Sequence, residues 1–130
     1  MPTTPPDNPL ADRHVLIVED EFMIAFTLQV AIEDAGGEAT IAATVKRALA
    51  DVATMALDEL PDIAILDVQV GTDAVYPVAD ALTEGGVPFV FHSGHADTDV
   101  LLGRYPGAAS LPKPAPLSAM TDRLAEMLAA

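Results

Sequence analysis

Five short apolar runs are spaced along the chain, and each is typical of a β-strand. The runs are His14–Val18, Glu38–Ala43, Ile63–Leu66, Val87–His92 and Ala108–Leu111. In Ile63–Leu66 four apolar residues follow one another, which predicts a central strand covered on both faces, as in a parallel sheet between helices. Glu38–Ala43 is the weakest run, so we expect it at an edge of the sheet.

Between these runs the apolar residues recur at helical spacing. A helix is predicted over Phe22–Ala35, with the apolar stripe Phe22, Ala25, Phe26, Leu28 and Ile32. Further helices are predicted after an N-cap at Thr44, from Tyr76 to Thr83, and from Leu117 to Leu128. The residues Val68–Asp73 are turn formers and predict a loop. The segment Ala96–Tyr105 is cut short by Gly103 and Pro106, which predicts a short or irregular fourth helix.

The alternation of strands and helices predicts an α/β fold with a five-stranded, doubly wound parallel sheet. This is the flavodoxin-like (βα)5 arrangement, with the strand order 2-1-3-4-5. At 130 residues, 51% of them hydrophobic, the chain has room for one core. We therefore expect one domain over residues 13–130, after a proline-containing flexible leader over residues 1–12.

The charge of the chain excludes several classes of function. Six Lys and Arg against 20 Asp and Glu give a net charge of −14, which disfavours binding to nucleic acid or to anionic membranes. The absence of cysteine excludes thiol catalysis and disulfides. No apolar run approaches the roughly 20 residues that cross a bilayer, so a cytoplasmic protein is expected.

Reactive side chains follow four of the five predicted strands. Glu19 and Asp20 follow the first strand, Asp67 the third, Ser93 the fourth and Lys113 the fifth. Right-handed crossovers bring the carboxyl ends of the strands to one edge of the sheet, so these groups should converge. Three adjacent carboxylates need a countercharge, and oxygen ligands suit Mg²⁺. A carboxylate beside Mg²⁺ can attack phosphorus, which indicates a phosphoryl-accepting aspartate.

These residues also carry a resemblance to a known family. Val18-Glu19-Asp20, Leu66-Asp67, His92-Ser93-Gly94 and Pro112-Lys113-Pro114 resemble the four signature sites of bacterial response-regulator receiver domains, over residues 13–129. The resemblance implies that Asp67 is the phosphoacceptor and that Ser93 and Lys113 contact its phosphoryl group. It also implies that Glu19, Asp20, Asp67 and the backbone carbonyl of Gln69 bind Mg²⁺, with no other cofactor.

The stretches 76–82 and 86–95 resemble, more narrowly, the FAT GUY single-domain regulators of alphaproteobacteria. His92-Ser93-Gly94-His95 stands where that subfamily usually has Ala-Thr-Gly-Tyr. Ser110 occupies the position three residues before the lysine, where ordinary receivers have an aromatic switch residue. A serine has no ring to bury, so we expect phosphorylation to pull Ser93 toward Asp67 and to order the segment Gly94–Pro106 instead.

The resemblance implies a function in two-component phosphorelay signalling. The chain would take a phosphoryl group from a histidine kinase or a histidine phosphotransfer protein, and would catalyse only its own phosphorylation and dephosphorylation. It would then serve as a phosphate shuttle or sink, or dock a downstream protein that the sequence does not identify. The face of the fourth and fifth helices is the candidate surface for a homodimer.

Two alternatives remain open at this stage. One is a binding module with the same fold that works without phosphorylation. The other is a slow aspartyl-phosphate hydrolase, although Gln69 stands where such enzymes have a second acid. A flavodoxin is rejected, because Glu19-Asp20-Glu21 would repel the flavin phosphate.

Two further groups of side chains have ordinary structural interpretations. His92, His95, Asp97 and Asp99 are more typical of a polar loop than of a transition-metal site. The four phenylalanines Phe22, Phe26, Phe89 and Phe91 are expected in the core.

Overall fold

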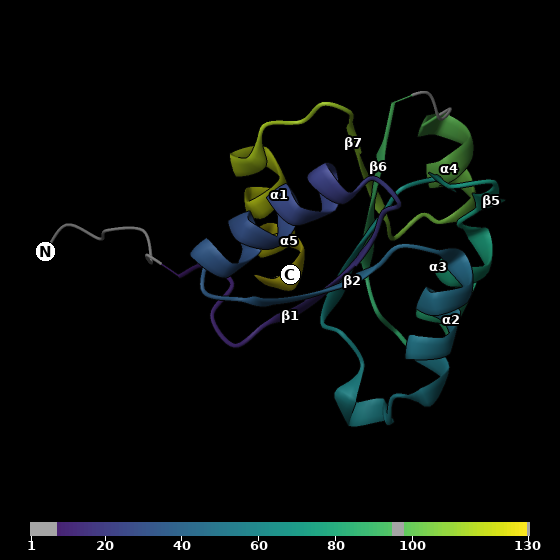
Figure 1. Ribbon diagram of the computed structural model, residues 1–130, viewed down its shortest axis with the longest axis horizontal. Coiled ribbons are helices and arrows are strands. Elements are labelled where there is room, and N and C mark those ends of the chain that lie inside the picture. Colours follow the sequence, from purple (N-terminus) through teal and green to yellow (C-terminus); the bar gives the residue numbers. More distant parts are fainter. Residues whose placement is uncertain (1–7, 95–97, 130) are drawn as a thin grey trace, which may run out of the picture.

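A five-stranded parallel sheet forms the centre of the protein (Figure 1). The computed structural model describes residues 8–94 and 98–129 of the chain. The strands are β1 (His14–Val18), β2 (Glu38–Ala42), β3 (Ile63–Leu66), β6 (Phe89–Ser93) and β7 (Ala109–Pro112). They lie in the order β2-β1-β3-β6-β7, and every neighbouring pair is parallel. The predicted fold class and strand order are therefore confirmed.

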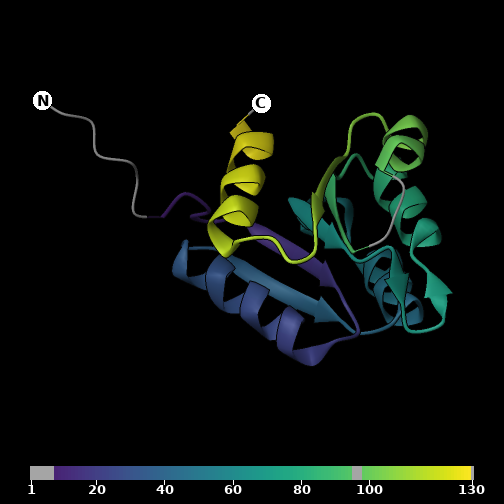
Figure 2. The same ribbon diagram turned by 90° about the horizontal axis from the view of Figure 1, so that it is seen from above.

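Helices cover both faces of this sheet. α1 (Phe22–Asp34) and α5 (Leu117–Ala129) lie on one face, and α2 (Val45–Thr54), α3 (Tyr76–Glu84) and α4 (Thr98–Arg104) lie on the other, as Figures 1 and 2 show. A 3₁₀ turn, η1 (Leu57–Glu59), leads into β3. α4 has seven residues, in agreement with the predicted short fourth helix. Within the described residues no helix has the length and apolar character needed to cross a membrane.

The central strand β3 is buried on both faces, as its unbroken apolar sequence predicts. Ile63 and Ile65 pack in the cluster with α1 and α5, while Ala64 and Leu66 pack with α2 and α3. β3 pairs with β1 so that Leu66 lies beside Val18. The two strands thus end at the same level, and the residues that follow them emerge together.

The segment after Asp67 differs from the predicted loop. β4 (Gln69–Val70) and β5 (Asp73–Ala74) form a small antiparallel hairpin. Gly71 has a φ of 63°, a left-handed conformation that glycine adopts without steric cost, and Val70 is buried. The turn-forming residues predicted a loop, whereas the hairpin and the burial of Val70 show that the segment packs against the rest of the protein.

Two of the phenylalanines predicted for the core are exposed. Phe22 is 70% and Phe26 45% accessible, and their rings stack with centroids 5.7 Å apart on the outside of α1. Ala25, Leu28 and Ile32 already fill the side of α1 that faces the sheet. The apolar stripe of this helix is wider than the surface it covers, so the core prediction is wrong for Phe22 and Phe26. Phe89 and Phe91 are buried as predicted.

The packed part of the chain begins before residue 13. Leu10, in the segment predicted as a leader, is fully buried among α1 and α5, and its N–H donates to the carbonyl of Ala35 at 2.9 Å. Residues 1–7 of that predicted leader lie outside the described residues. Leu10 therefore fills the core at the carboxyl end of α1.

Replacement of Leu10 tests this packing. Leu10→Ala should lower the free energy of unfolding by about 2–5 kcal/mol, because it leaves a cavity in a closed core. Urea denaturation measures the change. The matched control is Val100→Ala, since the Val100 side chain is 62% exposed and its loss should cost less than about 0.5 kcal/mol. Equal, small effects of both substitutions would contradict a structural role for Leu10.

Candidate functional site

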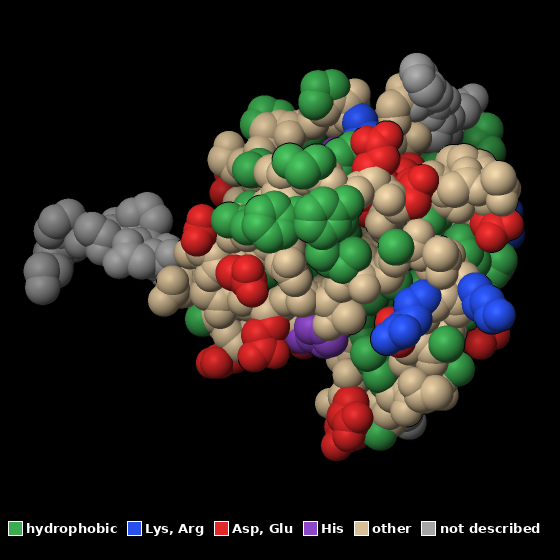
Figure 3. Space-filling model, viewed as in Figure 1, with side chains coloured by type: hydrophobic (Ala, Val, Ile, Leu, Met, Phe, Trp, Pro, Cys, Tyr) green, Lys and Arg blue, Asp and Glu red, His purple; other side chains and the backbone are tan. Residues whose placement is uncertain are grey.

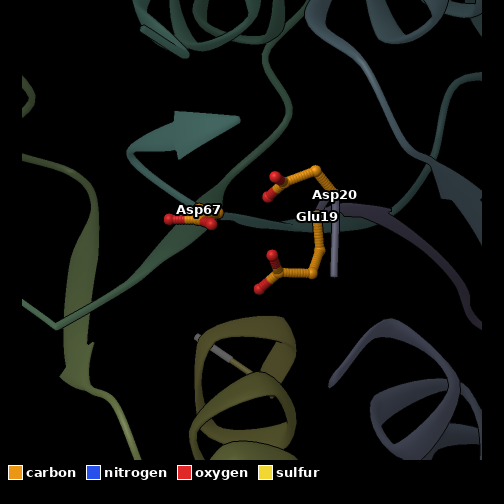
Figure 4. Close-up of side chains that lie close together, drawn as sticks. All are labelled: Glu19, Asp20 and Asp67. Atoms are coloured by element: carbon orange, nitrogen blue, oxygen red, sulfur yellow. The ribbon is translucent and has the colours of Figure 1, made fainter. Parts of the chain in front are cut away.

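Three carboxylates converge at the carboxyl edge of the sheet (Figure 4). Glu19 and Asp20 directly follow β1, and Asp67 directly follows β3. One oxygen atom from each group lies within 4.8 Å of the others. Glu19 is 2% exposed and Asp67 9%, whereas Asp20 is exposed to solvent. The convergence predicted from the strand ends is thus present, with two buried acids and one at the surface.

Lys113 lies between the two buried acids. Its Nζ is 2.7 Å from Glu19 Oε1 and 3.0 Å from Asp67 Oδ2. The residue follows β7, and its backbone N–H donates to the carbonyl of Ser93 at 3.1 Å, which ties the two strand ends together. One ammonium therefore bridges carboxylates that come from two other strands.

Burial and charge shift the titration of this cluster. Burial raises the pKa of Glu19 to about 7, and the ion pair with Lys113 opposes the shift. Burial alone would lower the pKa of Lys113, but its hydrogen bonds to Glu19 and Asp67 outweigh that effect and the pKa is raised. The lysine thus stays charged, while the protonation of Glu19 changes near neutral pH.

The cluster fits a hard divalent cation. It offers carboxylate oxygens within 4.8 Å of one another, one of them at the surface where an ion can enter. Oxygen ligands of this kind are the preferred ligands of Mg²⁺, which commonly keeps several waters. Glu19, Asp20 and Asp67 could therefore hold the ion.

The other residues predicted for the site take different positions. Gln69 donates its backbone N–H to Asp67 Oδ1 at 3.3 Å, and its side chain is exposed. Ser93 is the last residue of β6, half-buried, and lines the same groove as Asp67 and Lys113. Ser110 lies within β7 beside Phe91 and not at the carboxyl edge of the sheet. The structure therefore brings Ser93 and Gln69 to the acids and leaves Ser110 in the outermost strand, away from the carboxyl edge.

A groove of about 820 Å³ opens beside Asp67, between α1 and the segment that follows β7. Its polar lining includes Asp67, Gln69, His92, Ser93 and Lys113. Its apolar lining comes from Met23, Ile24, Leu28, Pro114, Ala115 and Leu117. Figure 3 shows apolar side chains gathered over α1, and those with large exposed areas on this helix are Phe22, Met23, Phe26 and Val30. Asp67 is thus approached past an exposed apolar surface.

The sequence interpretation placed His92 at the end of the fourth predicted strand, where β6 has it, but missed its burial. The side chain is 6% exposed, and neither ring nitrogen has a hydrogen-bond partner among the described residues. Burial, and next the charge of Lys113, lower its pKa. Strand alternation could have placed it on the side of Val90. His95 and Asp97 lie outside the described residues.

Tyr105, which follows α4, is also buried. Its hydroxyl donates to Asp80 Oδ1 of α3 at 2.7 Å, and its ring packs against Tyr76, Phe89 and Phe91. This contact fixes the carboxyl end of α4 against α3. The residues 95–97 of the predicted switch segment lie outside the described residues.

Solved structures share this architecture. A response regulator receiver protein from Sinorhizobium medicae WSM419 matches with a TM-score of 0.82 and 21% identity, over 92% of this chain and 96% of that chain. A CheY-like receiver domain protein from Methanospirillum hungatei JF-1 matches with a TM-score of 0.78 and 23% identity, over 92% and 95%. The chain has the receiver-domain fold. The non-phosphorylated HemR receiver domain from Leptospira biflexa also matches, with a TM-score of 0.76, 23% identity and coverage of 92% and 96%.

These identities establish the receiver-domain fold and no more. No protein-family model matches the chain, and no curated protein matches it. Within the receiver-domain fold, the acids of this chain occupy the carboxyl edge of the sheet, where open α/β sheets bind their ligands. What the site does follows from its own residues.

The raised pKa of Glu19 predicts a pH-dependent stability. In the absence of metal the folded state holds a proton on Glu19 up to about pH 7, whereas an unfolded glutamate loses it near 4.5. Between these values the folded state binds more protons than the unfolded state. The stabilisation that comes from the proton on Glu19 is therefore complete below pH 4.5 and is lost as the pH rises toward 7. The free energy of unfolding should fall by up to about 1.4 kcal/mol per pH unit relative to Glu19→Gln.

Denaturation of both proteins in EDTA across this pH range measures the difference. Glu33→Gln, at an exposed position on α1, should keep the pH dependence of the wild type. Parallel curves for the wild type and Glu19→Gln would show that the pKa of Glu19 is not raised.

Proposed function

We propose that this chain is a single-domain response regulator that accepts a phosphoryl group on Asp67 in a two-component phosphorelay. The donor is a histidine kinase or a histidine phosphotransfer protein. The observation that carries the proposal is the bridge from Lys113 to Asp67 and Glu19, with Asp20 beside them, at the ligand-binding edge of a receiver fold. A buried carboxylate held in this way is a fixed nucleophile with its countercharge already in place.

The proposed chemistry is a direct displacement at phosphorus. One oxygen of Asp67 attacks the phosphorus of a phosphohistidine, the new O–P bond forms while the P–N bond breaks, and the imidazole leaves with that electron pair. Gln69 holds Asp67 Oδ1 through its backbone N–H, and Lys113 contacts Oδ2, so the carboxylate has a defined orientation. Lys113 and the hydroxyl of Ser93 then contact the transferred phosphoryl oxygens.

Glu19, Asp20, Asp67 and the backbone carbonyl of Gln69 are the proposed ligands of Mg²⁺. These residues would hold the ion, which would supply positive charge for the phosphoryl oxygens. Gln69 carries an amide where a hydrolase would need a second acid, so the chain returns the phosphoryl group to water slowly. It catalyses its own phosphorylation and dephosphorylation and turns over no other substrate.

The surface around Asp67 is consistent with a protein as phosphodonor. The groove beside Asp67 has apolar walls from α1 and from the residues after β7, and it continues into the exposed side chains of α1. An exposed apolar patch next to a reactive group is typical of a protein-binding surface. The net charge of −14 favours a partner with a basic rim around its apolar contact.

The way in which the phosphorylated chain passes on its signal is part of the same proposal. With Ser110 at the position of the usual aromatic switch, the chain signals through a protein contact near Ser93 and α4 or passes the phosphoryl group on as a shuttle or sink. A homodimer through α4 and α5 is one form of such a contact. The assignment to the FAT GUY subfamily rests on the sequence motifs alone, and a cytoplasmic location follows from the proposed donors.

Substitution of the acceptor tests the proposal directly. Asp67→Asn should abolish labelling by radioactive acetyl phosphate, because an amide cannot form the acyl phosphate, and should leave the fold intact by circular dichroism. Asp73→Asn, at an exposed position on β5, should be labelled as the wild type is. Undiminished labelling of Asp67→Asn would place the acceptor elsewhere.

Metal binding should stabilise the fold. Mg²⁺ should raise the free energy of unfolding by about 2.7 kcal/mol at a hundredfold excess over Kd, since it binds the folded acids. Asp20→Asn should weaken this response and raise stability in EDTA, because it removes one of three adjacent negative charges. Thermal melting with and without Mg²⁺ measures both effects. A melting temperature of the wild type that does not change on addition of Mg²⁺ would argue against the metal site.

A further inference from the structure

His92 is a polar side chain in apolar surroundings. It shares its face of β6 with Val90, which packs in the cluster of α1 and α5, and it lies beside Leu111 of β7. It is 6% exposed, and both ring nitrogens lack a partner among the described residues. A buried donor or acceptor without a partner costs about 1–3 kcal/mol. An aliphatic residue would fit this position at lower cost, so packing does not account for the histidine.

The groove beside Asp67 places His92 next to the functional lysine. His92 lies in β6 and Lys113 directly follows the neighbouring strand β7, and both line this groove together with Asp67. Lys113 is bonded through its backbone N–H to Ser93, the residue after His92. The charge of Lys113 also lowers the pKa of His92, so the imidazole is neutral near pH 7 and has one nitrogen free to accept a hydrogen bond.

The contacts of Lys113 change if a divalent cation binds. Its ammonium has three N–H donors, and in this structure it contacts Glu19 Oε1 and Asp67 Oδ2. The remaining oxygens, Glu19 Oε2 and Asp67 Oδ1, already accept backbone hydrogen bonds. A cation at these carboxylates therefore competes for the oxygens that Lys113 uses, and it places two positive charges beside the ammonium. The Lys113 side chain is 21% exposed, so the displaced ammonium either turns toward solvent or takes another acceptor within the groove.

We propose that His92 is a positioning residue for Lys113 and accepts a hydrogen bond from its ammonium when a divalent cation occupies Glu19 and Asp67. This inference rests on the metal site of the proposed function. The imidazole keeps the lysine inside the groove, beside Asp67, instead of letting it swing into solvent. His92 thereby holds Lys113 ready for the oxygens of an incoming phosphoryl group.

A double-mutant cycle tests the inference through Mg²⁺ affinity, measured by thermal melting. His92→Leu should raise the melting temperature in EDTA and weaken Mg²⁺ binding roughly tenfold, the equivalent of one hydrogen bond to a charged group. His92→Gln, which retains an acceptor, should recover most of the affinity. In a Lys113→Met background His92→Leu should leave the affinity for Mg²⁺ unchanged, because no ammonium is then present to donate a hydrogen bond to His92.

The control is Val90→Ala, a change in a fully buried neighbour on the same face of β6. It should lower the melting temperature and leave the affinity for Mg²⁺ unchanged. A loss of affinity in His92→Leu that persists in the Lys113→Met background would show a general packing role and overturn the inference. Equal affinity of the wild type and His92→Leu would also overturn it, while the metal site itself would stand.

The wild type gives an independent readout. With ¹⁵N-labelled histidine, Mg²⁺ should shift the acceptor nitrogen resonance of His92, and Lys113→Met should remove the shift. This measurement decides the question even if His92→Leu does not fold, since an unmoved His92 resonance in Mg²⁺-bound protein would overturn the inference. A wild type that binds no Mg²⁺ at all would instead refute the metal site of the proposed function.

Discussion

The site depends on the neutralisation of buried negative charge. Glu19 and Asp67 are carried to the end of strands that are themselves buried, so neither carboxylate can rely on bulk water for its solvation. Lys113 supplies a countercharge at 2.7 and 3.0 Å. In a chain with a net charge of −14 this local cation is what lets two acids remain close together. The arrangement also leaves the cluster short of positive charge, which favours a divalent cation.

The geometry of the cluster follows from the sheet rather than from local loops. β1 and β3 are in register at Val18 and Leu66, so the next residue of each strand emerges at the same height. β6 and β7 pair up to Ser93 and Pro112, which brings the backbone of Lys113 to the end of its neighbour. Parallel pairing thus places reactive groups from four segments at one edge, on rigid supports. A shift of register by one residue would turn these side chains to the opposite face.

α1 and β6 each contain side chains whose burial is unusual for their type. α1 exposes phenylalanine side chains that could have been buried, and β6 buries an imidazole where an aliphatic side chain would be more stable. His92 lines the groove that leads to Asp67, and Met23, the residue next to Phe22 on α1, lines it as well. Departures from efficient packing concentrate at functional sites, because binding and chemistry require groups that stability alone would not select. Their position near Asp67 agrees with the protein-binding surface proposed above.

The sequence by itself determined the sheet and the composition of its reactive edge. The unbroken apolar run of β3 favours a strand covered on both faces, and right-handed crossovers reduce the possible arrangements of five such strands to a handful. Glu19, Asp67 and Lys113 could be placed together on that basis. Tertiary structure decided which apolar residues are covered, since periodicity assigns Phe22 and Phe26 to one side of a helix without showing how far its neighbours extend. It likewise decided the burial of Leu10 and His92, because each depends on contacts with segments distant in the sequence.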